Sequence, residues 1–133
     1  MRTHPIKSAE LVATVTQLRD VVPLIRHHHE NWDGTGYPDG LKGETIPLGS
    51  RIIMFADTID AMTTDRPYRA ALDATAVRKE LLRFRSTQFD PAICDALLKS
   101  PQYSKLFALA GNESSEWVHN TPDRGSVLRA AVS

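Results

Sequence analysis

The sequence contains one cysteine, no excess of either charge and no long apolar run. A single cysteine, Cys94, excludes an intramolecular disulfide and a zinc site built from cysteines, so a metal site must use His, Asp and Glu. The 16 Lys and Arg residues balance 16 Asp and Glu residues, so no overall field attracts nucleic acid or an anionic membrane. We expect no nucleic-acid partner, although zero net charge leaves room for a local basic cluster.

Membrane insertion and secretion are also excluded by what is missing. The apolar run from Ile52 to Ala56 is far shorter than the ~20 residues that span a bilayer. The polar stretch MRTHPIKSAE at the start lacks the apolar core of a secretory signal. We therefore expect a cytoplasmic protein with no membrane partner, and its 133 residues, 41% of them apolar, suit one compact domain.

Apolar residues recur every three or four positions with almost no strict alternation, which predicts an all-α fold, a helical bundle. Helices are expected from about Ser8, as N-cap, to 18 and from about 20 to 32, with Pro23 in the first turn of the second. A third follows Ser50 and is apolar nearly all round, so we expect it to be central and buried. Further helices begin after Asp73, at Asp90-Pro91 and at Ser100-Pro101.

The end of the chain differs in composition from the rest. After Gly111, which is expected to end the last helix, the chain is polar and lacks periodicity over most of its length. We therefore expect residues 1–110 to form the helical unit and residues 111–133 to be a poorly ordered tail.

Residues 33–49, here called the glycine-rich loop, hold five glycines and two prolines, which neither a helix nor a strand interior tolerates. The loop is longer than the usual connection of about 2 to 8 residues between helices, which favours a functional role. We predict an ordered, unusual loop; the alternative is a flexible linker.

Histidines and one aspartate indicate a metal site. Adjacent His28 and His29 on a helix point about 100° apart, so each would serve one of two neighbouring ions; a hydrogen-bonded pair without metal is the alternative. Asp57 lies in an otherwise apolar helix, where an unpaired carboxylate is costly unless a cation or strong donors meet it. A helix, a turn and a returning helix would bring His4 to the same end as His28.

Two arginines follow the Asp57 helix. Arg66 and Arg69 flank Pro67-Tyr68, and a pair of guanidinium groups suits phosphate. The alternative is a solvated arginine pair.

Several blocks together resemble the HD-GYP family of bacterial cyclic di-GMP phosphodiesterases. These are HPIKSAELV, HHENWDGTGYPDGL, RIIMFADTIDAMTTDRPYR and QFDPAICDALL, which cover residues 4 to 99 in the family's order. The resemblance implies a helical domain that holds divalent metal ions, usually iron or manganese and two in a complete domain, where a metal-activated water hydrolyses cyclic di-GMP to pGpG or GMP.

The resemblance also implies roles for individual residues. The implied metal ligands are His4, His28, His29 and Asp57. Tyr37, Arg66 and Arg69 would bind substrate. A third set would support the ligands or order the loop: Glu30, Asp33, Gly34, Gly36, Pro38 and Asp60. His27 receives no role and is expected to be exposed.

The sequence departs from the family in lacking the His-Asp dyad that gives the family half its name, because no histidine is followed by aspartate. In the family, that dyad precedes the segment matching HPIKSAELV. The resemblance therefore implies the C-terminal part of an HD-GYP domain, without its first helices. Apolar faces of the first and third helices would then be exposed, or would pair with an N-terminal HD segment or a second copy of the chain.

Three functions stay open from the sequence. The first is phosphodiester hydrolysis of cyclic di-GMP, which we expect to be slow in this chain because four ligands hold two ions poorly; another phosphate ester is a less favoured substrate. The second is a catalytically inactive module that binds cyclic di-GMP or a protein, for which the family suggests GGDEF-domain proteins. The third is a remnant without function.

Overall fold

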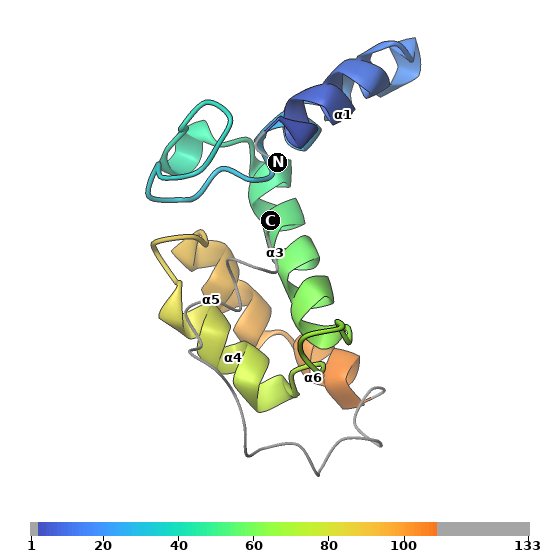
Figure 1. Cartoon of the computed structure of the whole chain (residues 1–133). Coiled ribbons are helices and arrows are strands. Elements are labelled where there is room, and N and C mark those ends of the chain that lie inside the picture. Colours follow the sequence, from blue (N-terminus) through green and yellow to red (C-terminus); the bar gives the residue numbers. More distant parts are fainter. Residues whose placement is uncertain (1–2, 109–133) are drawn as a thin grey trace.

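The computed structural model describes residues 3–108 (Figure 1), and no β-strand forms in that range, which confirms the predicted all-α class. The order of helices in that range, including two short 3-10 helices, is α1 (His4–Ala13), η1 (Thr16–Val21), α2 (Val22–His27), η2 (Gly43–Thr45), α3 (Leu48–Thr63), α4 (Ala74–Arg83), α5 (Pro91–Lys99) and α6 (Pro101–Ala108).

Helix α3 is the element on which the others are arranged. Figure 1 shows α1 beside its N-terminal end and α4, α5 and α6 around its C-terminal half. The core lies around this C-terminal half of α3. The helix contributes four residues to one buried cluster, Met54, Phe55, Ile59 and Met62, and the other members are Val77, Leu81, Phe89, Cys94 and Tyr103.

The expectation that α3 is buried all round is wrong. Ile52 is 51% exposed, and Asp57 and Asp60 lie on the exposed side as well. Ile52 is not part of the buried cluster that α3 forms with α4 to α6. Within the described residues, α3 therefore buries one side and exposes the other.

The predicted starts of the three later helices are confirmed, and local chemistry explains them. The Asp73 carboxylate accepts a hydrogen bond from the amide of Ala76 at 2.8 Å, and the Asp90 carboxylate accepts one from Ala92 at 2.9 Å. These acceptors satisfy backbone donors that a helix start leaves free. Pro91 and Pro101 occupy the first positions of α5 and α6, where a missing N–H costs nothing.

The first two helices differ from the prediction at their ends. Helix α1 begins at His4 rather than Ser8, because Pro5 fits the first turn, and it ends at Ala13, before the β-branched run 14–16. The 3-10 helix η1 takes up the segment between the expected helices. Helix α2 ends at His27 rather than near Trp32.

Ser50 does not cap α3 as expected. It lies inside α3, is 1% exposed, and its hydroxyl donates to the carbonyl of Leu24 at 2.9 Å. Gly49 also faces Leu24, since a Cβ built on Gly49 would come within 2.7 Å of a Leu24 methyl. The two small residues therefore let α2 approach α3 closely at Leu24.

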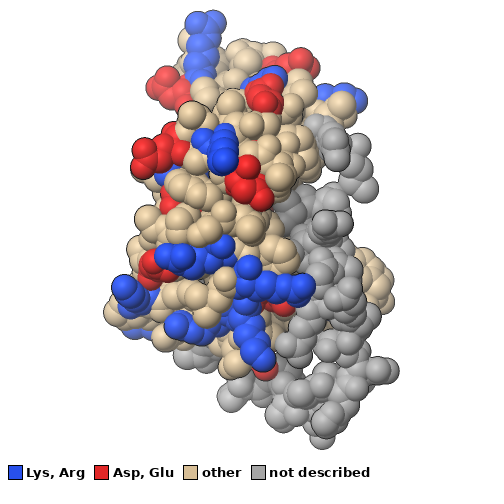
Figure 2. Space-filling view, turned by 90° about the vertical axis from the view of Figure 1, so that its left-hand side faces the viewer, with Lys and Arg blue, Asp and Glu red and all other residues tan. Residues whose placement is uncertain are grey.

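Zero net charge conceals an uneven distribution. Residues 3–65 carry 5 basic and 9 acidic side chains, a net −4, whereas residues 66–108 carry 8 basic and 4 acidic, a net +4. Figure 2 shows Lys and Arg gathered over the lower half of the face, the half that holds α4 to α6 in Figure 1. Zero net charge left room for a local basic cluster, and basic residues gather in this part of the structure.

Two further expectations concern membrane spans and the tail. Among the described helices, none combines the length and the hydropathy that crossing a bilayer requires. The predicted helix end at Gly111 and the tail 111–133 lie outside the described residues.

Candidate metal centre

Three of the four predicted metal ligands, the histidines, form one group, and the fourth, Asp57, lies beside His28. His4 is the first residue of α1, His28 caps the C-terminal end of α2, and His29 follows it. The hairpin of α1 and α2 brings the three rings into contact, with centroids 4.6 Å apart for His4 and His29 and 4.1 Å apart for His28 and His29. Asp57 reaches the group from α3, with Oδ2 3.7 Å from Nε2 of His28.

The spacing of the ring nitrogens suits one cation. One ligand nitrogen from each of His4, His28 and His29 lies within 4.8 Å of the others. The Nε2 atoms of His4 and His29 are 3.0 Å apart. Two nitrogens that bind one ion at ~2.1 Å and at right angles are separated by about that distance. The same distance fits a hydrogen bond between the rings if one nitrogen carries the proton.

The tautomer of His28 is fixed by its neighbour. Nδ1 of His28 lies 2.6 Å from the carbonyl oxygen of Ile25. Because a carbonyl only accepts, Nδ1 must be the donor, and Nε2 then carries the free lone pair in the neutral ring. That nitrogen lies 3.7 Å from Oδ2 of Asp57, and the arrangement resembles metal sites where a backbone carbonyl orients the ligand histidine.

His29 is kept neutral by its surroundings. It is 6% exposed, and the Tyr37 ring stacks on it at 5.1 Å with an interplanar angle of 12°. Burial lowers the pKa of His29 to about 4, with smaller contributions from His28 and His4. A neutral imidazole at physiological pH can offer a lone pair to a cation.

The side chain of Asp57 is exposed, contrary to the reasoning from an apolar helix. It is 58% exposed, so its charge needs no buried partner. Its separation of 3.7 Å from His28 exceeds a hydrogen bond. Asp57 therefore faces His28 across a gap that a shared cation would fill.

The expected divergence of His28 and His29 is also wrong. The expectation assumed that both lie inside one helix, but α2 ends at His27 and the chain turns at the histidine pair. The amide of Glu30 bonds to the carbonyl of His27 at 3.1 Å, which closes that turn. Both rings consequently face His4, and one ion can be reached by all three.

The glycine-rich loop is fastened by buried and local acceptors. The Glu30 carboxylate, at 2% residue exposure, accepts bonds from the amides of Asp39 at 2.7 Å and Leu41 at 3.1 Å. The Asp33 carboxylate accepts from the amide of Thr35 at 3.0 Å. The amides of Trp32 and Asp33 donate to the carbonyls of Gln88 and Thr87, which ties the loop to the turn before α5.

Three more loop positions shape the approach to His29. Gly34 has φ +86°, a conformation that favours glycine. Gly36 lies against the backbone of 29–31 with no room for a side chain. Pro38 follows Tyr37 through a cis peptide bond.

Asp60 is exposed on α3, and its backbone carbonyl accepts a bond from the Thr64 hydroxyl at 2.7 Å.

The two arginines lie beyond the end of α3. Arg69 donates to the carbonyls of Ala61 at 2.7 Å, Ala70 at 2.9 Å and Met62 at 3.2 Å, so it caps the C-terminal end of this helix. Arg66 is exposed, and its backbone pairs with that of Arg69. A phosphate role for either stays a prediction.

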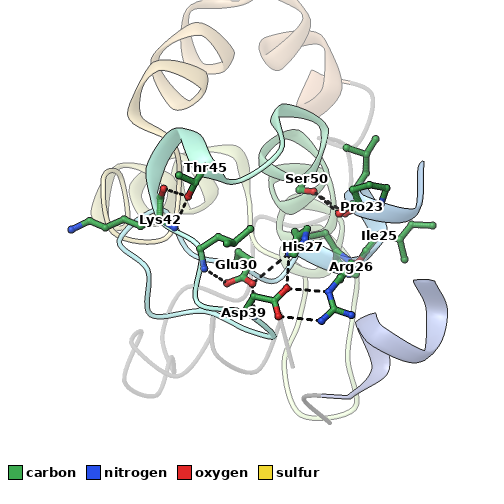
Figure 3. A network of polar contacts seen from close by, with 12 residues as sticks. Pro23, Ile25, Arg26, His27, Glu30, Asp39, Lys42, Thr45 and Ser50 are labelled. Atoms are coloured by element: carbon green, nitrogen blue, oxygen red, sulfur yellow. Dashed lines mark hydrogen bonds and ion pairs between the residues drawn. The ribbon is translucent and has the colours of Figure 1, made fainter. Parts of the chain in front are cut away.

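Sequence reasoning missed two residues of the neighbouring polar network. His27 was expected to be exposed, but its side chain is only 14% exposed and faces Glu30 and Asp39 (Figure 3). Asp39 also pairs with Arg26 through two bonds of 3.0 and 3.1 Å. No periodic signal marks Asp39, because it lies in the glycine-rich loop.

Neutral His29 makes the stability of the metal-free protein depend on pH. Its pKa falls from the ordinary 6.5 to about 4 on folding, so the unfolded chain takes up the proton first. The contribution of neutral His29 is therefore complete above about pH 6.5 and is lost as the pH falls towards 4. We expect urea unfolding of chelator-treated protein to show a decline over this window that is shallower in His29→Gln. Parallel curves for the two proteins would refute this.

The chain matches the HD domain family over residues 1–93 of 133. It therefore belongs to this family, and the resemblance to HD-GYP domains is confirmed. One of the blocks that carry that resemblance, HHENWDGTGYPDGL, contains the histidine pair and Tyr37, whose ring stacks on His29.

Two bacterial proteins match about three quarters of this chain. The chain is 44% identical over 101 residues to the cyclic di-GMP phosphodiesterase response regulator RpfG of Xanthomonas campestris pv. campestris, which covers 74% of this chain and 27% of that protein. It is 37% identical over 110 residues to a probable cyclic di-GMP phosphodiesterase of Vibrio cholerae, with coverages of 77% and 25%. The chain thus spans about a quarter of the length of these relatives.

A solved structure supports the fold. A cyclic GMP-AMP specific phosphodiesterase from Vibrio cholerae superposes with a TM-score of 0.61 at 21% identity, covering 98% of this chain and 33% of that one. At this identity the likeness establishes the helical HD-type fold.

Proposed function

We propose that this chain supplies the metal centre of a phosphodiesterase that hydrolyses a cyclic dinucleotide, with cyclic di-GMP as the favoured substrate. The observation that supports it is the meeting of His4, His28, His29 and Asp57, with two Nε2 atoms 3.0 Å apart. The names of the relatives, which include cyclic di-GMP and 3'3'-cGAMP phosphodiesterases, point to the same class of substrate.

The residues fit a divalent ion. Three imidazoles and a carboxylate are the mixed donors that Fe, Mn and Zn accept, and His28 presents a lone pair fixed by Ile25. We favour Fe or Mn, with a second ion in a complete domain. When bound, such an ion would lower the pKa of water and stabilise negative charge on the reacting phosphate.

The protein's own residues would position the ion and the substrate. Burial and the Tyr37 ring keep His29 neutral and limit the access of water on that side. Tyr37 belongs to the glycine-rich loop and stacks on His29, so its ring would also contact the substrate. Arg66 and Arg69 would bind the non-reacting phosphate oxygens, for which Arg69 has to share donors now held by the end of α3.

An assay for products tests the proposal. The purified chain, loaded with Mn²⁺ or with Fe²⁺ without oxygen, is incubated with cyclic di-GMP, and pGpG and GMP are separated by chromatography; 3'3'-cGAMP is the second substrate. We expect slow formation of pGpG that requires the added ion and disappears in His28→Ala. Product formed equally by His28→Ala would contradict the role of the centre.

A binding module without catalysis is the second candidate. It is favoured because the described residues offer four ligand atoms at this centre, fewer than two ions need. In this case the same samples would bind cyclic di-GMP in equilibrium dialysis without forming pGpG. GGDEF-domain proteins are the protein partners that this alternative would favour.

Exposed apolar residues suggest how the centre would be completed. Leu11 is 72% exposed, Val15 and Leu18 are each 43% exposed, and Leu48 and Ile52 are 57% and 51% exposed. We propose that these residues, which lie on α1, at the start of and within η1, and on α3, pack against an N-terminal HD segment that brings further ligands, or against a second copy of the chain.

A further inference from the structure

A second group of possible ligands lies at the end of α2, apart from the four residues of the metal centre. His27 is the last residue of α2, Glu30 lies three residues further on, and Asp39 is in the glycine-rich loop (Figure 3). One ligand atom from each lies within 4.8 Å of the others. We propose that these three residues form a separate structural site for a divalent transition-metal ion, which fastens the glycine-rich loop to α2.

The distances suit a shared cation better than direct hydrogen bonds. Nδ1 of His27 lies 3.6 Å from Oε1 of Glu30 and 3.5 Å from Oδ2 of Asp39. Both separations exceed a normal N–H···O bond. Two ligands that bind a tetrahedral ion at ~2.1 Å lie ~3.4 Å apart. An ion placed between the three atoms would therefore need little movement of the side chains.

Burial strengthens this interpretation. Nδ1 of His27 is inaccessible to solvent, and within residues 3–108 it finds no hydrogen-bond partner. The side chain of Glu30 is fully buried. A buried polar atom without a partner is costly, so it needs either a proton shared with the two carboxylates or a cation.

The remaining donors and charges are compatible with an ion. Glu30 uses Oε1 to accept the amide of Asp39, and a carboxylate oxygen retains a second lone pair. Arg26 donates to both oxygens of Asp39, including Oδ2, the one nearest His27, which also retains a second lone pair. With neutral His27 the two carboxylates and Arg26 sum to −1, so a divalent ion leaves +1, and water can complete the coordination. Imidazole with carboxylates favours Zn²⁺, Mn²⁺ or Fe²⁺ over Ca²⁺.

The consequence for the loop is mechanical. Asp39 lies two residues after Tyr37, whose ring stacks on His29. An ion that joins Asp39 to His27 and Glu30 would hold the loop residues next to Tyr37 in the position that the structure shows. The proposal does not require that the metal centre be catalytic.

Zinc titration of the whole, chelator-stripped chain tests the proposal. We compare wild type with His27→Asn, which places an amide N–H near the position of Nδ1 and can donate to the carboxylates, but is a poor ligand. Calorimetry measures the stoichiometry and affinity of Zn²⁺ binding, and the melting temperature measures the stability gained from Zn²⁺. We expect wild type to bind one Zn²⁺ more than His27→Asn, or to bind that ion at least ~10-fold more tightly, and to gain more thermal stability from Zn²⁺.

The metal centre provides the internal control. His28→Ala removes a ligand of that centre and is expected to keep the Zn²⁺ that His27→Asn loses, so failure of one site does not mimic failure of the other. Asp39→Asn serves as a second variant if His27→Asn does not fold. Equal stoichiometry, affinity and Zn²⁺-induced stabilisation in wild type and in the folded variant would overturn the proposal and leave His27 as a polar neighbour of the two carboxylates only.

Discussion

Replacing His29 by glutamine is expected to lower the affinity of the protein for Mn²⁺ by at least ~100-fold, more than the loss of a residue that only supports a ligand. His29 is the most buried of the four ligands, its Nε2 lies 3.0 Å from Nε2 of His4, and burial keeps it neutral. Glutamine has similar volume but lacks the imidazole lone pair. Calorimetry on chelator-stripped protein at pH 7 measures the change.

The matched control is Asp60→Asn. The family resemblance implied a supporting role for Asp60, but the structure exposes this residue on α3, three positions after Asp57, and its bonds to Thr63 and Thr64 use the backbone carbonyl. We expect Asp60→Asn to leave Mn²⁺ affinity unchanged and Asp57→Asn to weaken it. Equal losses in Asp60→Asn and His29→Gln would mean that Mn²⁺ responds to the acidic surface rather than to the centre.

Gly36→Ala is expected to be the most destabilising substitution in the glycine-rich loop, costing about 3 kcal/mol or more of unfolding free energy. A Cβ at this position would lie 2.3 Å from the amide nitrogen of Asn31, 2.4 Å from the carbonyl oxygen of His29 and 2.6 Å from Cα of Glu30. These are backbone atoms that carry the histidine pair, so the loop or the pair must move. Urea unfolding in the absence of metal measures the loss.

Gly43→Ala separates this clash from the general strain of a glycine conformation. Gly43 has φ +59°, but nothing lies within 4 Å of a Cβ built on it. The expected cost is only that of a left-handed alanine, about 1 kcal/mol. Gly36→Ala and Gly43→Ala with the same small loss would show that the loop does not press against the histidine turn.

Local signals predicted the later half of the fold well. Asp73, Asp90-Pro91 and Ser100-Pro101 mark helix starts that depend on residues within one turn, and the structure places α4, α5 and α6 there. The start of α1 was displaced because Ser8 resembles a cap, whereas Pro5 had already set the first turn. Ser50 failed as a cap for a non-local reason, since its hydroxyl bonds to Leu24 on another helix.

The sequence predicted which residues belong to the candidate metal centre, but not how their side chains are oriented. Residue types and the family blocks identified His4, His28, His29 and Asp57; the structure groups the three histidines and places Asp57 beside His28. The mutual orientation of His28 and His29 depends on the end of α2 at His27, which no propensity marks. The exposure of Asp57 depends on which side of α3 the helices α4 to α6 cover, and the apolar pattern alone does not reveal this.

The network around His27 depends entirely on tertiary structure. Asp39 reaches His27 only because the buried Glu30 carboxylate binds the amides of Asp39 and Leu41 and folds the loop back. The spacing of His27, Glu30 and Asp39 in the sequence does not predict a metal site. Similarly, Arg51 and Asp90 join α3 to α5 through an ion pair of 2.7 Å between residues far apart in sequence.

Anomalous diffraction from crystals grown with Mn²⁺ tests the central claim most directly. We predict a manganese peak within bonding distance of Nε2 of His28 and His29, with His4 and Asp57 as the other protein ligands. A peak only at other residues, or imidazoles of His4 and His29 joined by a hydrogen bond with no metal between them at saturating Mn²⁺, would contradict the account.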